Sequence, residues 1–119
     1  MNWIELTDLN QLDEVEAQSA SKPVLIFKHS STCSLSRTAL DRLQRRWNTA
    51  EASEVPVYFL NIQANRKVSD AIAERFSVRH ESPQAIVLRN ATVVYDQSHL
   101  GINYEEIQKH VAPALQDAH

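Results

Sequence analysis

Three apolar segments of the chain predict strands in the interior of a sheet. Residues 24–27 are four consecutive apolar residues that follow a Lys-Pro dipeptide, and residues 55–62 and 84–88 are also mainly apolar. A short continuous apolar segment bounded by turn residues is typical of a strand that is buried on both faces. Residues 3–6 predict a further, short strand at the edge of the sheet.

Four other segments, beginning near residues 8, 33, 65 and 103, repeat apolar residues at the three- and four-residue spacing of a helix. The residues expected to face the core are Leu9, Leu12 and Val15; Leu35, Ala39, Leu43 and Trp47; Val68, Ile72 and Phe76; and Tyr104, Ile107, Val111 and Leu115. The second helix should extend to about residue 48 and carries several arginines on its other face. We interpret this basic face as a solvent-exposed helix surface rather than a binding patch.

Polar residues at the starts of three helical segments predict helix caps. Asp8 with Gln11, and Asn103 with Glu106, have the three-residue spacing of a capping box. Asn65 is a third candidate cap.

The order of these segments predicts the fold class. Residues 84–88 and 92–95 are separated by a turn of three residues, which predicts an antiparallel hairpin. The complete order is β-α-β-α-β-α-β-β-α, and helices between the early strands favour parallel pairing. We therefore expect an α/β fold with three layers, α/β/α, a mixed central sheet, and a single domain over residues 1–119.

Composition limits the function classes. The chain has 119 residues and a net charge of −3, which argues against a nucleic-acid partner. No apolar segment approaches the roughly 20 residues that span a bilayer, and the N-terminus lacks the pattern of a signal peptide. A single cysteine excludes an internal disulfide and suits a reducing compartment. We expect no membrane partner and a cytoplasmic location.

The single cysteine, Cys33, stands where the strand at residues 24–27 gives way to a helix. Unpaired N–H groups at a helix start carry partial positive charge, which favours the thiolate, and the thiolate is the nucleophile. Lys28, His29 and Arg37 can add positive charge. The alternative is a buried, inert cysteine, but the neighbouring Thr32, Ser34 and Ser36 are polar. We therefore predict a reactive thiol, supported by Thr32.

Two neighbours of the thiol have alternative roles. His29 can hydrogen-bond the thiolate or move a proton, or it can face solvent at the strand end. Ser36 can donate to the thiolate from the first helical turn, or it can lie on the helix surface. A metal site is not expected, because zinc needs three or four ligands and the chain has one cysteine.

The element order resembles that of thioredoxin, in which the reactive cysteine stands at the start of the helix after a central strand. The dithiol motif of that fold has a second cysteine three residues on, and this chain has Ser36 there. A cis-proline faces the cysteine in that fold, and Pro83 after Ser82 occupies the matching place. An X–Pro bond tolerates the cis form, so we predict a cis Ser82–Pro83 bond.

The closer resemblance is to the YtxJ-type monothiol bacilliredoxins. The segment Phe-Lys-His-Ser-Ser-Thr-Cys at residues 27–33 is similar to the Phe-Lys-His-Ser-x-x-Cys signature of that family, and Ser-Pro-Gln at 82–84 is also similar. The family usually has proline directly after the cysteine, whereas this chain has Ser34. Proline at the first helical position removes an N–H, so Ser34 changes the number of donors around the sulfur.

The resemblance implies a thiol-disulfide oxidoreductase that removes bacillithiol, or a similar low-molecular-weight thiol, from S-thiolated client proteins. Cys33 would attack the mixed disulfide, and free bacillithiol would act as co-substrate, with no bound cofactor. Ser82 and Pro83 would bind the substrate.

Two other functions remain open. One is a thioredoxin-fold module that binds peptides without turnover, and the other is a thiol-dependent redox sensor. Iron–sulfur binding, as in monothiol glutaredoxins, is a minor alternative because their Cys-Gly-Phe-Ser motif is missing.

Overall fold

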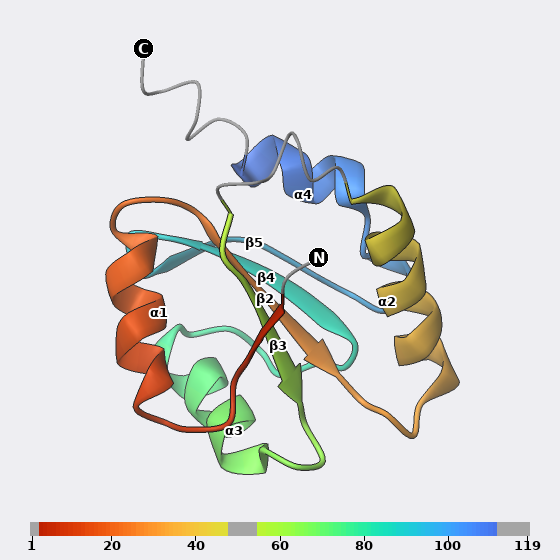
Figure 1. The fold of residues 1–119 in the computed structure, drawn as a ribbon, viewed down its shortest axis with the longest axis horizontal. Helices are drawn as coiled ribbons and strands as arrows, with labels where there is room; N and C mark the ends of the chain where they lie inside the picture. The colour runs from red at the N-terminus through yellow and green to blue at the C-terminus, as the bar shows by residue number, and fades with distance from the viewer. Residues whose placement is uncertain (1–2, 48–54, 112–119) are drawn as a thin grey trace.

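A computed structural model describes residues 3–47 and 55–111 of the chain (Figure 1). The elements in order are β1 (Trp3–Glu5), α1 (Gln11–Ser19), β2 (Val24–His29), α2 (Ser34–Arg46), β3 (Val57–Asn61), α3 (Arg66–Arg75), β4 (Gln84–Arg89), β5 (Thr92–Ser98), the short 3-10 helix η1 (His99–Gly101) and α4 (Tyr104–Val111). The predicted order is confirmed, with η1 as an addition. α2 ends at Arg46, two residues before the expected end near residue 48, and the inward position of Leu115 lies outside the described residues.

The sheet is mixed, with strand order β1-β3-β2-β4-β5. β3 pairs in parallel with β1 and β2, whereas β4 is antiparallel to β2 and β5. β2 is the central strand, and all six of its residues are buried. The predicted edge position of the first strand and central position of the second are therefore confirmed. The carboxyl end of β2 points toward the loop that carries Cys33.

Helices cover both faces of the sheet, which confirms the predicted three layers (Figure 1). α1 and α3 pack on one face with Val24 and Ile26 of β2. α2 and α4 pack on the other face with Leu25 and Phe27. Burial of each such side chain contributes about 1.5–3 kcal/mol. Because successive side chains along a strand point to opposite faces, each residue of β2 contacts the helices on one face only.

The hairpin between β4 and β5 is confirmed, with Arg89 paired to Thr92. Its two central residues, Asn90 and Ala91, both have positive φ, of 52° and 59°. Such a two-residue turn matches the right-handed twist of paired strands. The N–H groups of both residues donate to Ser19, so the end of α1 holds the turn.

The helix starts differ in part from the predicted caps. Asn103 Oδ1 accepts the N–H of Glu106 at 3.1 Å, as expected. Asn65 is the N-cap of α3 but makes no side-chain cap hydrogen bond; its amide nitrogen donates to the carbonyl of Asn61. The predicted cap from the Asn65 side chain is therefore wrong.

The start of α1 also differs in part: the bond from the Asp8 N–H to the Gln11 side chain, one half of the predicted capping box, is present, whereas Asp8 bonds another N–H than that of Gln11. The side-chain oxygen of Gln11 accepts the N–H groups of Thr7 and Asp8, whereas the carboxylate of Asp8 accepts the N–H of Asn10. The helix therefore begins at Gln11, two residues after Leu9. Leu9 is 49% exposed, so its predicted place in the core is wrong.

No helix within the described residues is long and apolar enough to cross a membrane.

Candidate active site

Cys33 is the N-cap residue of α2 and has an extended backbone, with φ −106° and ψ 118°. Its carbonyl accepts the N–H groups of Ser36 and Arg37 at 3.1 and 3.2 Å. Its side chain makes no capping hydrogen bond and is half-buried. The alternative of a fully buried cysteine is therefore wrong, and the sulfur is left available for a partner from solution.

The loop before the cysteine is folded back on the helix. The N–H of Cys33 donates to the carbonyl of Ser30 at 3.2 Å, which closes a turn over Ser31 and Thr32. The N–H of Ser30 donates to Oγ of Ser36 at 3.0 Å. These two bonds connect the end of β2 to the first turn of α2 and set the position of the sulfur between them.

His29 and Ser36 contact each other inside the protein. Nδ1 of His29 lies 2.8 Å from Oγ of Ser36, and the two residues are 7% and 0% exposed. The alternatives of a solvent-facing His29 and a surface Ser36 are therefore wrong. The hydrogen-bond partners of the Ser36 hydroxyl among the described residues are His29 and Ser30, and not the sulfur.

The imidazole of His29 is biased toward its neutral form. Burial lowers its pKa, and the positive charge of Arg37 lowers it further. Arg37 is exposed in the first turn of α2. Arg37 thus lies at the same end of the helix as Cys33, and its expected effect on the thiolate stays a prediction.

Lys28 lies on the opposite face of the sheet from His29. Its side chain is fully buried, and Nζ donates to the carbonyl of Ser69 at 3.2 Å and lies 3.2 Å from Nδ1 of His80. Burial lowers the pKa of Lys28 to about 8, partly opposed by the charge of Asp70. The expected contribution of Lys28 to the thiol site is therefore wrong, because successive strand residues point to opposite faces.

Ser82 and Pro83 lie beside the loop of Cys33. Gln84 pairs with Lys28 across the antiparallel strands, so the two residues before Gln84 adjoin the end of β2. The Ser82–Pro83 bond is cis, which confirms the prediction. The hydroxyl of Ser82 is buried and has no hydrogen-bond partner within the described part of the chain.

Thr32 is exposed next to Cys33, and its hydroxyl oxygen accepts a hydrogen bond from the side-chain amide of Gln63. Gln63 lies in the loop between β3 and α3, and the sequence analysis did not identify it. A single exposed glutamine in a loop leaves no signal in an apolar pattern. The parallel pairing of His29 with Asn61 is what places this loop beside Cys33.

A metal centre is not supported: no group of three or more metal-binding side chains lies together among residues 3–47 and 55–111.

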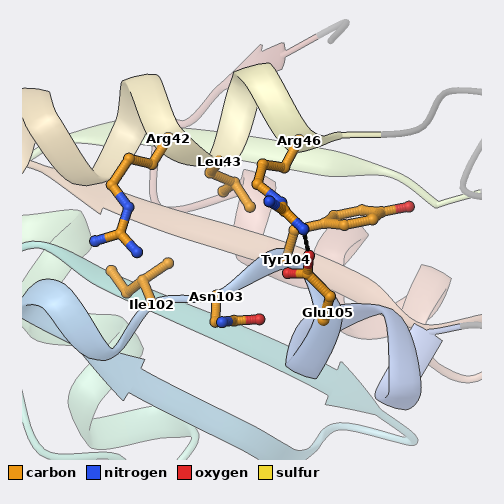
Figure 2. Close-up of a pocket in the computed structure, with 7 residues that line it drawn as sticks. All are labelled: Arg42, Leu43, Arg46, Ile102, Asn103, Tyr104 and Glu105. Carbon is orange, nitrogen blue, oxygen red and sulfur yellow. Dashed lines mark ion pairs between the residues drawn. The ribbon is translucent and has the colours of Figure 1, made fainter.

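A cavity of about 150 Å³ lies between α2 and the start of α4, toward the end of α2 away from Cys33 (Figure 2). Arg42 and Arg46 line it, and Arg46 forms an ion pair with Glu105 of α4. Both arginines are exposed, as are Arg37 and Arg45, so the interpretation of the basic face as a solvent-exposed helix surface is confirmed. The ion pair of Arg46 joins α2 to α4 on one face of the sheet.

Comparisons with known proteins show the family and the fold of the chain. A family model described as monothiol bacilliredoxin BrxC matches residues 4–107. A solved structure described as an oxidoreductase candidate with a thioredoxin fold is similar at 32% identity, with a TM-score of 0.75, over 89% of this chain and 90% of that chain.

More distant structures share the fold. Thioredoxin from Fasciola hepatica is 14% identical, with a TM-score of 0.66, over 92% of this chain and 97% of that chain. Thioredoxin from Malassezia sympodialis is 12% identical, with a TM-score of 0.70, over 97% and 90%. Together with the single half-buried cysteine at the start of α2, these matches place the chain in the monothiol bacilliredoxin family, as a thiol oxidoreductase of thioredoxin fold.

Proposed function

We propose that the chain removes bacillithiol, or a similar low-molecular-weight thiol, from mixed disulfides of client proteins. This proposal rests on the residue three positions after Cys33, which is a serine and not a second cysteine. Ser36 is fully buried there and hydrogen-bonded to His29 and Ser30. A mixed disulfide on Cys33 therefore has no internal thiol to resolve it, and a second, external thiol must do so.

The reaction consists of two thiol-disulfide exchanges. The Cys33 thiolate attacks the bacillithiol sulfur of the client disulfide, which forms a Cys33–bacillithiol bond and releases the client cysteine as a thiolate that takes a proton. Free bacillithiol, as a thiolate, then attacks the bacillithiol sulfur held on Cys33. This step releases Cys33 as a thiolate and yields bacillithiol disulfide. In the net reaction the client sulfur gains one electron and the sulfur of the free bacillithiol loses one, whereas the bacillithiol taken from the client keeps its oxidation state, so the electrons balance.

The start of α2 supplies the electrostatics of both steps. The first N–H groups of a helix have no carbonyl partner within the helix and carry partial positive charge. The sulfur of an N-cap residue lies beside them, and Arg37 is exposed in the same turn. The Cys33 thiolate is the attacking group in the first step and the leaving group in the second.

Ser82 and Pro83 form the other side of the proposed substrate site. They adjoin the end of β2 through the pairing of Gln84 with Lys28. The hydroxyl of Ser82 is buried, so an extended client segment would meet the backbone of these residues. The proposed partners are therefore S-thiolated client proteins and the small thiol itself, in the cytoplasm, where thiols are kept reduced.

The test is an intact-mass measurement with a bacillithiolated client protein. When free bacillithiol is withheld, the wild-type chain should gain the mass of one bacillithiol, whereas Cys33→Ala should gain none. Addition of free bacillithiol should then remove the adduct. A wild type that binds client peptides but never captures the thiol would instead be a binding module, and an adduct that free bacillithiol does not remove would indicate a redox sensor.

A further inference from the structure

One glutamine side chain holds three consecutive residues of the loop before Cys33. Oε1 of Gln63 accepts the N–H of Ser31 at 3.0 Å and lies 3.3 Å from its hydroxyl. Nε2 of Gln63 donates to Oγ of Ser30 and to Oγ1 of Thr32, each at 2.7 Å. These four bonds use the two donors of the amide and two acceptor positions of its oxygen.

The backbone fixes which way the amide faces. The N–H of Ser31 is a donor and cannot accept, so the atom of Gln63 that it meets must be the oxygen. The nitrogen is then the atom that meets Ser30 and Thr32, and both hydroxyl oxygens act as acceptors toward it.

Gln63 is itself held in place by the end of β3. Its backbone N–H donates to Oδ1 of Asn61 at 3.1 Å, and the N–H of Ala64 lies 3.4 Å from the same oxygen. Asn61 pairs with His29 in the sheet. The amide is therefore tied to the same two strands that set the position of the Cys33 loop.

The hydroxyl protons of Ser30 and Thr32 are not used by Gln63, because both oxygens accept from its amide. Oγ of Ser30 and Oγ1 of Thr32 are 3.4 Å apart, so one of them can donate to the other. Ser30 is 8% exposed, and a buried hydroxyl proton without an acceptor is unfavourable. On this ground we assign Ser30 as the donor in this pair, which leaves the proton of the exposed Thr32 hydroxyl free beside Cys33 in the chain.

We propose that Gln63 is a positioning residue for the nucleophile: its amide orders the loop at Ser30 to Thr32 and keeps the Thr32 hydroxyl proton free to donate to the Cys33 thiolate. This inference rests on the proposed role of Cys33 as the attacking group. A hydrogen bond to an ionised sulfur is stronger than one to a neutral group. Gln63 thus acts on the reaction through Thr32 and not by contact with the substrate.

The test is the rate of Cys33 alkylation by iodoacetamide as a function of pH, followed by intact mass. Gln63→Ala should move the midpoint of this profile to higher pH by about one unit, and lower the rate at neutral pH by about tenfold. The alkylation rate at high pH, where Cys33 is ionised in all molecules, should be the same as in wild type. The control is Gln44→Ala, which removes an exposed glutamine of α2 and should leave the profile as in wild type.

Thr32→Val should give the same shift, and Gln63→Ala should add little to it in the double variant, because both remove one donor. An unchanged midpoint in Gln63→Ala, or fully additive shifts, would overturn the proposal. If Gln63→Ala fails to fold, an unchanged midpoint in Thr32→Val overturns it equally. Alkylation by iodoacetamide requires no bacillithiol. Failure of wild type to capture bacillithiol would therefore overturn the proposed function, while the alkylation profiles would still test the role of Gln63.

Discussion

Oγ of Ser36 lies 2.8 Å from Nδ1 of His29, in a place that water does not reach. In dithiol relatives this position would carry a second thiol. Here the hydroxyl joins the first turn of α2 to the end of β2, and it also accepts the N–H of Ser30. The residue that replaces the second thiol thus supports the loop of Cys33 without being a nucleophile.

The first prediction is that Ser36→Ala destabilises the fold by about 1–3 kcal/mol, because it leaves the buried N–H of Ser30 unpaired. Urea unfolding measures this change. Capture of a small thiol by Cys33 should persist, since the bond from the Cys33 N–H to the carbonyl of Ser30 still closes the loop. Ser34→Ala, which changes an exposed serine of the same turn, is the control and should change stability by less than about 0.5 kcal/mol. Loss of capture in a folded Ser36→Ala variant would contradict this account.

The second prediction concerns Ser36→Cys. Two thiols three residues apart in a first helical turn can close an internal disulfide, so the variant should release bacillithiol from Cys33 by internal attack. Intact mass after one turnover should show an oxidised protein without the adduct, whereas wild type keeps the adduct when free thiol is withheld. Persistence of the adduct in the variant would show that the sulfur at position 36 cannot reach Cys33.

The third prediction is that the stability of the fold decreases at acid pH because of His29. The pKa of His29 is lowered by burial and by Arg37, so between the folded pKa and 6.5 the unfolded chain holds a proton that the folded chain does not. The free energy of unfolding should therefore fall as the pH drops below 6.5. His29→Asn keeps a polar atom near the place of Nδ1 and should lose this part of the acid sensitivity. Urea midpoints at two pH values measure the difference.

Arg37→Gln provides an independent check. Removal of the positive charge should raise the pKa of His29 toward 6.5, and an NMR titration of the ring protons would show it. A titration unchanged from wild type would mean that burial is sufficient to explain the shift.

The sequence predicts most of the fold because most residues of the apolar pattern are buried in one of the two cores. The four apolar residues of β2 alternate between the two faces, and Val68, Ile72 and Phe76 of α3 are all buried. Leu9 and Leu35 are exceptions. Leu9 precedes α1, which begins at Gln11, and Leu35 is only half-buried and belongs to neither core.

The candidate site is predictable only in part. The places of Cys33 and Pro83 in the site can be predicted, because each lies next to a strand that the apolar pattern identifies. The hydrogen bonds of Gln63 do not, since they depend on which loops meet at one end of the sheet. The burial of Ser36 is also missed, because a serine in a first helical turn is usually a surface residue.

The fourth prediction concerns Lys28, whose side chain is fully buried with a pKa lowered to about 8. Below pH 8 both folded and unfolded chains hold the proton, and the folded chain bears the full cost of a buried charge. Between pH 8 and 10.5 the unfolded chain alone holds the proton, so stability should rise with pH, by about 3 kcal/mol in total. Lys28→Met fills a similar volume without a charge. The variant should therefore be more stable than wild type at pH 7, by about 1–3 kcal/mol.

The dependence of this difference on pH separates charge from packing. The advantage of Lys28→Met should shrink as the pH rises from 8 toward 10.5, because wild-type Lys28 becomes neutral and keeps its bond to the carbonyl of Ser69. Lys67→Met changes an exposed lysine of α3 and should show no such trend. Urea unfolding of the three proteins at several pH values measures both effects. A difference between Lys28→Met and wild type that stays constant across this range would mean that Lys28 keeps its proton when buried, held by Asp70.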